Sequence, residues 1–226
     1  MIRTIALSLT ICFLFGAASV YSGDQAAGAQ KATIEKKVEM EKRAPAAPAQ
    51  GTAKTYPVRD PKNKIVTIET NFGKMTLELY HDVAPAHADS FAARVADGFY
   101  KNTKFHRIID GFMIQGGDPK GDGTGSASYK LKAEFSQLPH QEGTLSMARP
   151  GDVNGASCQF FICLAQAKML DGQYTIFGQL LKGYEVLHKI GKTPVEASNT
   201  GEKSKPVSPV IFQNAYVSDA DGNPKK

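Results

Sequence analysis

Hydrophobic and polar positions alternate along the early part of the folded region. Residues 65–70 and 75–79 both carry an apolar side chain at every second position. A period of two is typical of a β-strand with one buried face. The residues between the two runs include Gly73, which favours a hairpin turn. We therefore predict a β-hairpin whose inward side chains are Val66, Ile68, Met75, Leu77 and Leu79.

A helical period follows. From Pro85 onward, apolar residues recur at spacings of three and four, at Ala88, Phe91, Ala92 and Val95. Proline favours a helix N-terminus and the later Gly98 a C-terminal stop, so one amphipathic helix is predicted here. Residues 184–190 predict a second, shorter helix closed by Gly191. His81 and His87 flank the first helix start without a third ligand of matching geometry, and we interpret them as surface histidines.

The run FHRIIDGFMIQGGDP, residues 105–119, combines strand periodicity with unusual chemistry. Alternation places Phe105, Arg107 and Ile109 on one face of a strand and His106 and Ile108 on the other. After a turn at residues 110–111, it places Met113 and Gln115 together, opposite Phe112 and Ile114. Two readings are open, an ordinary hairpin with one odd cation or a surface where Arg, Gln and bulky hydrophobes face a ligand.

Further strands are predicted at residues 144–148, 159–164, 175–180 and 207–217. With about eight strands and only two helices, the chain does not show the βαβ alternation of a parallel sheet. A closed barrel removes exposed strand edges, and helices at its ends bury their apolar faces. The predicted fold is mainly β, a closed eight-stranded antiparallel barrel capped by two α-helices.

The N-terminal region differs from the rest in composition. Residues 1–22 join Arg3 to an apolar run and small residues, the pattern of a signal peptide, or of an N-terminal anchor if it is not cleaved. Residues 23–57 are rich in Ala, Lys and Pro and are predicted to be a disordered linker. The folded domain is assigned to residues 58–219, and residues 220–226 to a flexible tail.

Export implies an oxidising compartment, where the two cysteines outside the leader could pair. On one strand, Cys158 and Cys163 would lie about 16 Å apart, five residues at roughly 3.3 Å each. A disulfide needs less than about 7 Å between Cα atoms, so two free thiols are predicted. The net charge of +5 is scattered over the 226 residues, which argues against nucleic-acid binding.

Hydrolytic chemistry is poorly supported. Cys158, in the run GASCQ, loosely resembles a thiol-protease segment and would need His140 or His106 as its base. No Ser lies in a G-x-S-x-G elbow, and no pair of carboxylates stands out. What remains is a set of apolar and amide side chains at alternate positions, which periodicity alone assigns to the core more readily than to a binding site.

Four segments decide between these readings: FHRIIDGFMIQGGDPKGDGTG, GTLSMAR, CQFFICLA and LDGQYTIFGQL. In this order, over about residues 62–217, the chain resembles the cyclophilin-type peptidyl-prolyl cis-trans isomerases. ADGFYKNTKFHR is most similar to the short-looped bacterial branch of the family, and together with the predicted leader this leads us to expect an exported bacterial-like member. The resemblance implies the capped barrel, isomerase activity on X-Pro bonds, and no cofactor or metal.

The resemblance also implies site residues. Arg107, Phe112 and Gln115 would be catalytic, with Arg107 stabilising the twisted amide and Gln115 hydrogen-bonding the substrate backbone. The side chains that would bind substrate, in the proline pocket and the adjoining groove, are Met113, Ala148, Arg149, Gln159, Phe161, Leu170 and Tyr174. Tyr174 stands where the family often has His, and its ring is expected to close the pocket.

Two positions depart from the family pattern. Met169 stands where cyclosporin-sensitive members carry Trp, which predicts weak cyclosporin binding, and Cys158 replaces the usual Ser. The expected partners are unfolded or flexible proline-containing polypeptides, the expected state is a monomer in the periplasm or secreted, and a membrane is involved only if the leader stays attached. The alternative function is a proline-peptide binding module or holdase whose isomerase activity is incidental.

Overall fold

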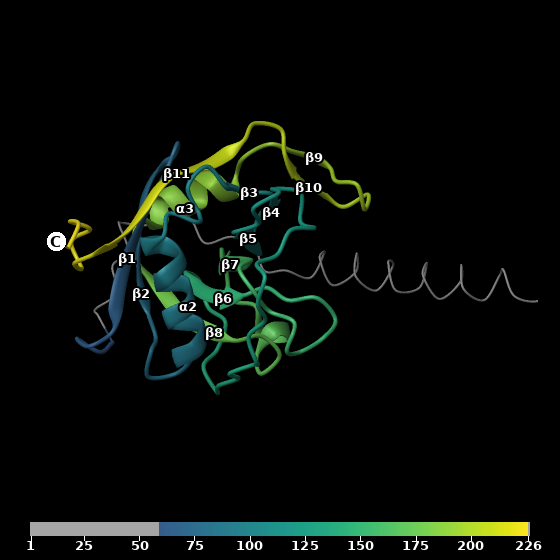
Figure 1. Ribbon diagram of the computed structural model, residues 1–226. Helices are drawn as coiled ribbons and strands as arrows, with labels where there is room; N and C mark the ends of the chain where they lie inside the picture. The colour runs from purple at the N-terminus through teal and green to yellow at the C-terminus, as the bar shows by residue number, and fades with distance from the viewer. Residues whose placement is uncertain (1–58, 226) are drawn as a thin grey trace, which may run out of the picture. The chain divides into compact units, whose positions relative to one another are not determined.

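The computed structural model describes residues 59–225, which form a nearly closed antiparallel β-barrel with two α-helices (Figure 1). The nine strands of its sheet run in the order β3-β11-β1-β2-β8-β6-β7-β5-β4. Their bounds are β1 Lys64–Thr70, β2 Gly73–Leu79, β3 Lys104–Phe105, β4 Arg107–Ile109, β5 Met113–Gly116, β6 Thr144–Met147, β7 Phe160–Cys163, β8 Ile176–Lys182 and β11 Val210–Ser218.

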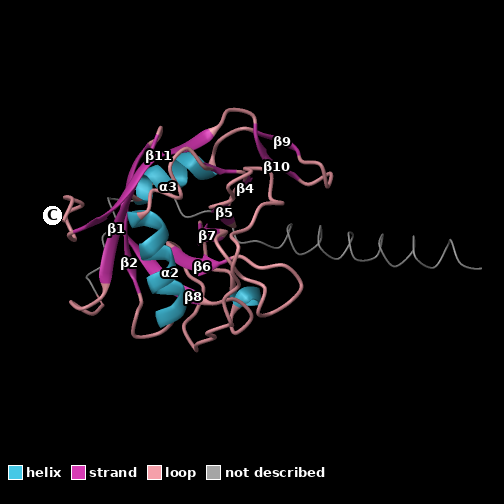
Figure 2. Cartoon of the chain, in the orientation of Figure 1, coloured by secondary structure: helices cyan, strands magenta, loops and turns pink. Residues whose placement is uncertain are grey.

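The helices are α2 (Pro85–Ala96) and α3 (Tyr184–Gly191), with a short 3-10 helix, η1, at Lys168–Leu170 (Figure 2). Helix α2 packs against β1, β8 and β11, whereas α3 packs against β2, β4 and β5. The first helix begins at Pro85 and ends before Gly98, whose φ of 70° lies in the left-handed region that favours glycine. The helix pattern in the sequence is therefore confirmed in both places.

The first hairpin is also confirmed. β1 and β2 pair from Lys64 with Leu79 to Thr70 with Gly73, so Asn71 and Phe72 form the turn. All five side chains predicted to point inward are fully buried in the main core. Around them Phe91 meets Tyr100, Phe160 and Phe177 at ring-centroid distances of 5.0–5.4 Å. Aromatic groups of this size contribute much of the buried apolar area of a small barrel.

The strand count is nine rather than eight, because the predicted strand at residues 105–109 is interrupted at His106. β3 pairs with β11, whereas β4 pairs with β5, and the backbone N–H of His106 donates to Gln115 instead. The interruption also corrects the predicted faces. Phe105 lies in the main core with Ile108, and Arg107 faces a separate cavity, so simple alternation fails across this bend.

A second, two-stranded sheet was missed by the sequence analysis. β9 (Val195–Ala197) and β10 (Lys203–Pro206) form a hairpin that packs against β4 (Figure 1). Its strands are short and mostly polar, and only Ser204 is fully buried, so hydrophobic periodicity gave no signal there. This hairpin matters because its tip reaches the candidate site.

His87 corrects another prediction, because it is buried rather than at the surface. Its side chain has no exposed area, and Nδ1 lies 2.6 Å from a carboxylate oxygen of Glu134. Burial lowers the pKa of His87, although Glu134 opposes that shift. His81 is exposed, as predicted, and lies 3.3 Å from Asp89. Within residues 59–225, no group of three or more His, Cys, Asp or Glu side chains could hold a metal ion.

The chain ends are described only in part. The predicted leader and linker, residues 1–57, lie outside the described residues. Residues 219–225 form a hydrogen-bonded turn, in which the backbone N–H of Asp219 donates to Asn223 and that of Lys225 to Val217. The flexibility predicted for residues 220–226 stays a prediction. Over residues 59–225, no helix is long and apolar enough to cross a membrane.

Candidate active site

Three adjacent strands place the central candidate residues in one row. Arg107 of β4 is paired with Gln115 of β5, and Gln115 is paired with Phe161 of β7. Side chains directly opposite each other in antiparallel strands project from the same face. The barrel therefore presents a cation, an amide and an aromatic ring side by side, although the residues are up to 54 positions apart in the chain.

These side chains border a cavity of about 210 Å³. Met113 and Phe161 are its most buried apolar members, and Phe112, Leu170 and Tyr174 pack against them in a cluster separate from the main core. We call this cavity the proline pocket, after the ligand that the family resemblance implies. The residues that line it are Arg107, Phe112, Met113, Gln115, Ala148, Arg149, Phe161, Leu170 and Tyr174. Nine of the ten candidate residues thus surround one cavity, and the tenth, Gln159, lies beside it.

Phe112 reaches the pocket for a reason that alternation does not describe. It lies in the turn before β5, where its N–H donates to the carbonyl of Ile109. Strand periodicity does not apply in the turn, so Phe112 and Met113 can both face the pocket although they are neighbours. The sequence predicted opposite faces for these two residues, and that expectation is wrong.

Aromatic contacts hold the pocket walls. The rings of Phe161 and Tyr174 meet edge to face at 5.8 Å, and the guanidinium of Arg149 lies 4.9 Å from the Tyr174 ring centroid. The Arg149 side chain also donates to the carbonyls of Gln173, Pro150 and Gly151. Arg149 and Tyr174 therefore stabilise one another at the rim, as an arginine over an aromatic face does.

Behind the pocket, His140 supports the ring of Phe161. The two rings are stacked 6.0 Å apart at 16°. Nδ1 of His140 lies 2.9 Å from Asp171, and Nε2 lies 3.0 Å from the hydroxyl of Ser146. Burial lowers the pKa of His140, against the opposing effect of Asp171. The hydroxyl of Ser146 donates its one proton to the carbonyl of Thr175 over 3.0 Å, and the contacts at Nδ1 and Nε2 fix the plane of the His140 ring.

Ser146, His140 and Asp171 are the residue types of a hydrolytic triad, but their location argues against that use. Ser146 and His140 are fully buried, and neither borders the pocket. The thiol alternative is also disfavoured. Cys158 and Cys163 are free thiols, as predicted, and burial raises the pKa of both, that of Cys163 to about 12. A nucleophilic cysteine needs a lowered pKa.

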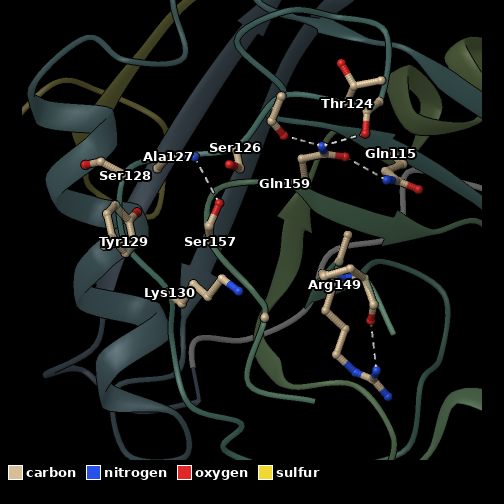
Figure 3. Close-up of a pocket in the computed structure, with 15 residues that line it drawn as sticks. Gln115, Thr124, Ser126, Ala127, Ser128, Tyr129, Lys130, Arg149, Ser157 and Gln159 are labelled. Atoms are coloured by element: carbon tan, nitrogen blue, oxygen red, sulfur yellow. Dashed lines mark hydrogen bonds between the residues drawn. The ribbon is translucent and has the colours of Figure 1, made fainter. Parts of the chain in front are cut away.

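A wider groove of about 390 Å³ adjoins the proline pocket (Figure 3). It shares Gln115, Ala148 and Arg149 with the pocket, and its far wall is the loop at residues 123–130. That loop is anchored by Asp118, a fully buried side chain that accepts hydrogen bonds from the N–H groups of Lys120, Asp122 and Gly123. Burial raises the pKa of Asp118, but these donors outweigh that effect and lower it.

Two amides connect the pocket to the groove, as Figure 3 shows. Nε2 of Gln115 donates to Oε1 of Gln159 over 3.0 Å. Nε2 of Gln159 in turn donates to the carbonyls of Gly125, at 2.7 Å, and Gly123, at 3.1 Å. The orientation of Gln115 is therefore tied to the glycine-rich loop.

Glu202, at the tip of the β9–β10 hairpin, is a site residue that sequence reasoning missed. Its carboxylate accepts from Nε of Arg107 at 2.5 Å and from Nη2 at 2.8 Å. The side chains of Arg107 and Glu202 are 27% and 19% exposed, so the pair is partly shielded from water. His140 was also missed as a supporting residue, because Asp171 is 31 positions away and no local signal marks the contact. Asp118 was missed although its partners lie within five residues of it, because the sequence does not show that the carboxylate is buried.

Fold and site together define a β-barrel with an apolar pocket, bordered by one cation and one amide and continued by a groove for extended chain. Such a surface suits a peptide with an apolar ring. The chain matches the family "cyclophilin type peptidyl-prolyl cis-trans isomerase/CLD" over residues 65–217. It belongs to this family and is a cyclophilin-type peptidyl-prolyl cis-trans isomerase.

Similar proteins come from bacteria and eukaryotes. A peptidyl-prolyl cis-trans isomerase of Helicobacter pylori strain J99 is 41% identical over 144 residues, which cover 61% of this chain and 88% of the relative. The peptidyl-prolyl cis-trans isomerase-like 1 of Mus musculus is 41% identical over 160 residues, covering 68% and 92%. A bacterial-like subtype is therefore not singled out by these similarities.

Solved structures agree with the fold. The crystal structure of a cyclophilin type peptidyl-prolyl cis-trans isomerase of Cryptosporidium parvum is 35% identical, with a TM-score of 0.65, and covers 70% of this chain and 98% of that one. A second structure of the same Cryptosporidium protein was determined in the presence of the dipeptide Ala-Pro; its TM-score is 0.64, and it covers 69% of this chain and 99% of that one.

Proposed function

We propose that Arg107 lowers the barrier to X-Pro rotation by stabilising the twisted amide. The barrier of about 18–20 kcal/mol arises from resonance, which is lost when the peptide bond twists. In the twisted state, the nitrogen becomes pyramidal and accepts a hydrogen bond. A guanidinium that already points at the pocket can donate to that nitrogen or hold the prolyl carbonyl without reorganising. The observation that carries this proposal is the row of Arg107, Gln115 and Phe161 beside one apolar cavity.

The other pocket residues hold the substrate while one part of it turns. Phe112, Met113, Phe161, Leu170 and Tyr174 enclose the proline ring, and Gln115 binds the backbone beside it. Excluding water favours the less polar twisted amide. Ala148, Arg149 and Gln159 line the groove for the residues that precede proline. The Ala-Pro dipeptide used with the Cryptosporidium relative supports a proline-containing peptide as the ligand of this chain. No bond is broken, so the proposed step uses no nucleophile, metal or cofactor.

The clients we propose are unfolded or flexible exported polypeptides. This rests on the sequence of residues 1–22, whose pattern predicts a signal peptide, with an N-terminal anchor as the alternative. Residues 58–219 would then act as a monomeric foldase, in the periplasm or secreted, with residues 23–57 as a linker. N-terminal sequencing of the protein from its native compartment tests this. A mature chain that begins near residue 23 supports the proposal, and an intact leader supports a tethered form.

A second candidate function is a proline-peptide binding module or holdase in which isomerisation is incidental. The large groove favours it, because the groove offers more surface than the reacting bond needs. The two functions differ in what an inactive variant can do. If a variant without isomerase activity still promotes refolding of a proline-limited client at the wild-type rate, the binding module is the better description.

Arg107→Ala tests the proposed mechanism. Removing one preorganised electrostatic donor costs about 2.7–4 kcal/mol, so kcat/KM for an X-Pro peptide should fall at least about a hundredfold. The thermal unfolding midpoint serves as the check on folding. Arg59→Ala is the matched control, because Arg59 pairs with Asp82 and lies over Tyr80, outside both the pocket and the groove. Near-normal activity of a folded Arg107→Ala protein would refute the mechanism.

A further inference from the structure

The tip of the β9–β10 hairpin contributes a charged group to the proline pocket from outside the barrel. Glu202 holds Arg107 through two parallel hydrogen bonds, on Nε and Nη2. The remaining nitrogen, Nη1, lies 3.5 Å from Oε1 of Gln115 and 3.8 Å from the sulfur of Met113, both of which line the pocket. The carboxylate thus occupies one edge of the guanidinium and leaves the other edge facing the cavity.

The hairpin is built to deliver Glu202 to this position. The backbone N–H of Ser198 donates to the carbonyl of Glu202 over 2.8 Å, and that of Gly201 donates back to Ser198. Gly201 has a φ of 80°, so the turn uses a conformation that glycine adopts without strain. The hydroxyls of Ser198 and Thr200 lie 2.9 Å apart and add a side-chain contact inside the turn.

A free arginine has many rotamers, and its guanidinium can point in many directions. A bidentate carboxylate fixes both the position and the plane of the group. Catalysis that depends on electrostatic stabilisation requires this, because a donor that must first be oriented loses much of its effect. From this geometry we propose that Glu202 is a positioning residue for catalysis, acting through Arg107. The proposal rests on the proposed role of Arg107 in the isomerase reaction.

The decisive variant is Glu202→Gln in the full chain. Glutamine retains the size of the side chain but cannot accept both hydrogen bonds of the fork. We expect kcat to fall about tenfold, less than the hundredfold that a 1 Å displacement of a catalytic group can cost. KM should change less than twofold, because the substrate pocket itself is intact. Glu202→Asp retains the carboxylate on a side chain one methylene shorter and should recover part of the lost kcat.

The matched control is Glu196→Gln on the same hairpin. Glu196 pairs with Lys205 over 2.8 Å, both side chains are more than half exposed, and neither borders the pocket. This control should leave kcat unchanged. If Glu202→Gln leaves kcat within twofold of wild type, or raises it, the positioning role is overturned.

A nuclear magnetic resonance measurement separates positioning from general stabilisation of the hairpin. The Nε–H signal of Arg107 is identified by its loss in Arg107→Ala. In the wild type this N–H should be protected from solvent exchange, and its chemical shift should differ from that of free arginine. The shift should return toward the free-arginine value in Glu202→Gln and should remain at the wild-type value in Glu196→Gln. An unchanged Arg107 signal in Glu202→Gln contradicts the proposal, whatever the activity.

A double variant distinguishes the positioning role of Glu202 from the catalytic role of Arg107 on which it rests. If Glu202 acts through Arg107, adding Glu202→Gln to Arg107→Ala should cause no further loss, whereas independent effects would multiply. If Arg107→Ala itself is active, the proposed mechanism fails. If Arg107→Ala is inactive and Glu202→Gln is normal, only the positioning role fails.

Discussion

The proline pocket and the adjoining groove share three residues but are built differently. The pocket is small, and its apolar walls come from the paired strands β5 and β7, the turn at Phe112, Ala148 just after β6, and the segment from Leu170 to Tyr174. The groove is nearly twice as large, and much of its lining is loop backbone, glycine and hydroxyl groups. An apolar cavity with fixed walls recognises one shape, whereas loop amides and carbonyls recognise an extended backbone of almost any sequence.

Such a difference would let one enzyme act on many proline-containing peptides. The pocket would select for proline, and the groove would add affinity without a strong requirement for the preceding side chains. Substitutions in the pocket should therefore have large effects on every peptide. Substitutions in the groove should have small effects that depend on the peptide.

The largest effect in this comparison is expected from Phe161→Ala, which removes a wall of the pocket. Losing burial of three proline methylenes, at about 0.8 kcal/mol each, corresponds to a roughly fiftyfold loss of kcat/KM. The control is Phe135→Ala, because Phe135 is 44% exposed and borders neither cavity. Phe161→Leu, which retains an apolar side chain, should lie between wild type and Phe161→Ala. A loss below threefold in Phe161→Ala would mean that the ring binds elsewhere.

The second prediction concerns the rim of the pocket at Met169, which lies beside Leu170 in η1 and is 49% exposed. Met169→Trp adds a flat apolar surface and an N–H donor there. We expect weak cyclosporin inhibition of the wild type and at least about tenfold tighter inhibition of Met169→Trp, on the scale of one buried aromatic contact with one hydrogen bond. Met169→Leu should remain weakly inhibited. Tight inhibition of the wild type contradicts this prediction.

The third prediction concerns the support of the pocket by His140. Burial lowers its pKa below the ordinary value of 6.5, so the unfolded chain binds more protons than the folded one as the pH falls through 6.5. The free energy of unfolding should therefore decrease from pH 7.5 to pH 5, with contributions also from His87 and His106, whose pKa values burial lowers in the same way.

Urea unfolding at several pH values measures this slope. The free energy of unfolding of His140→Gln should depend less on pH than that of the wild type, because one of the three histidines whose pKa burial lowers is gone. The exposed residue Phe135 gives the control, since Phe135→Ala removes no titrating group and should retain the full slope. A His140→Gln protein with the wild-type slope would show that His140 does not change its proton binding on folding.

The smallest effect is expected in the groove at Lys130, an exposed side chain on its far wall. An exposed ion pair contributes about 0–1 kcal/mol, so peptides with Glu before the X-Pro unit should be favoured over those with Lys by at most about fivefold. The preference should shrink in Lys130→Ala and in 1 M salt, and Lys182→Ala should leave it unchanged. A preference above tenfold would show that the groove selects sequence more strongly than its open construction suggests.

Local patterns predicted most of the fold. The hairpin of β1 and β2 and the helix α2 follow from side-chain periods of two and 3.6, which depend only on neighbours in the chain. Side-chain periodicity did not predict the break at His106 or the turn position of Phe112, because a period describes regular structure and not its interruptions. The β9–β10 hairpin was not predicted because its short polar strands have almost no apolar alternation.

The residues of the site also fall into those that the sequence predicts and those that it does not. Similarity of short motifs to a known family identified the pocket residues, and the structure places them around one cavity. Glu202 is 95 residues from Arg107, and Asp171 is 31 residues from His140, so neither partner is marked by spacing. Such contacts depend on how distant segments meet in the barrel, and that information is not present in any local pattern of residues.

The chain of amides between pocket and groove has a consequence for hydrogen-bond polarity. Because Gln159 gives both protons of its Nε2 to the loop carbonyls, its oxygen must accept, and Gln115 must donate. The oxygen of Gln115 is then obliged to turn toward Nη1 of Arg107. The orientation of the Gln115 amide is therefore set from two sides, by the acceptor oxygen of Gln159 and by the guanidinium of Arg107, and a flip of this amide would place its NH₂ group against the cation.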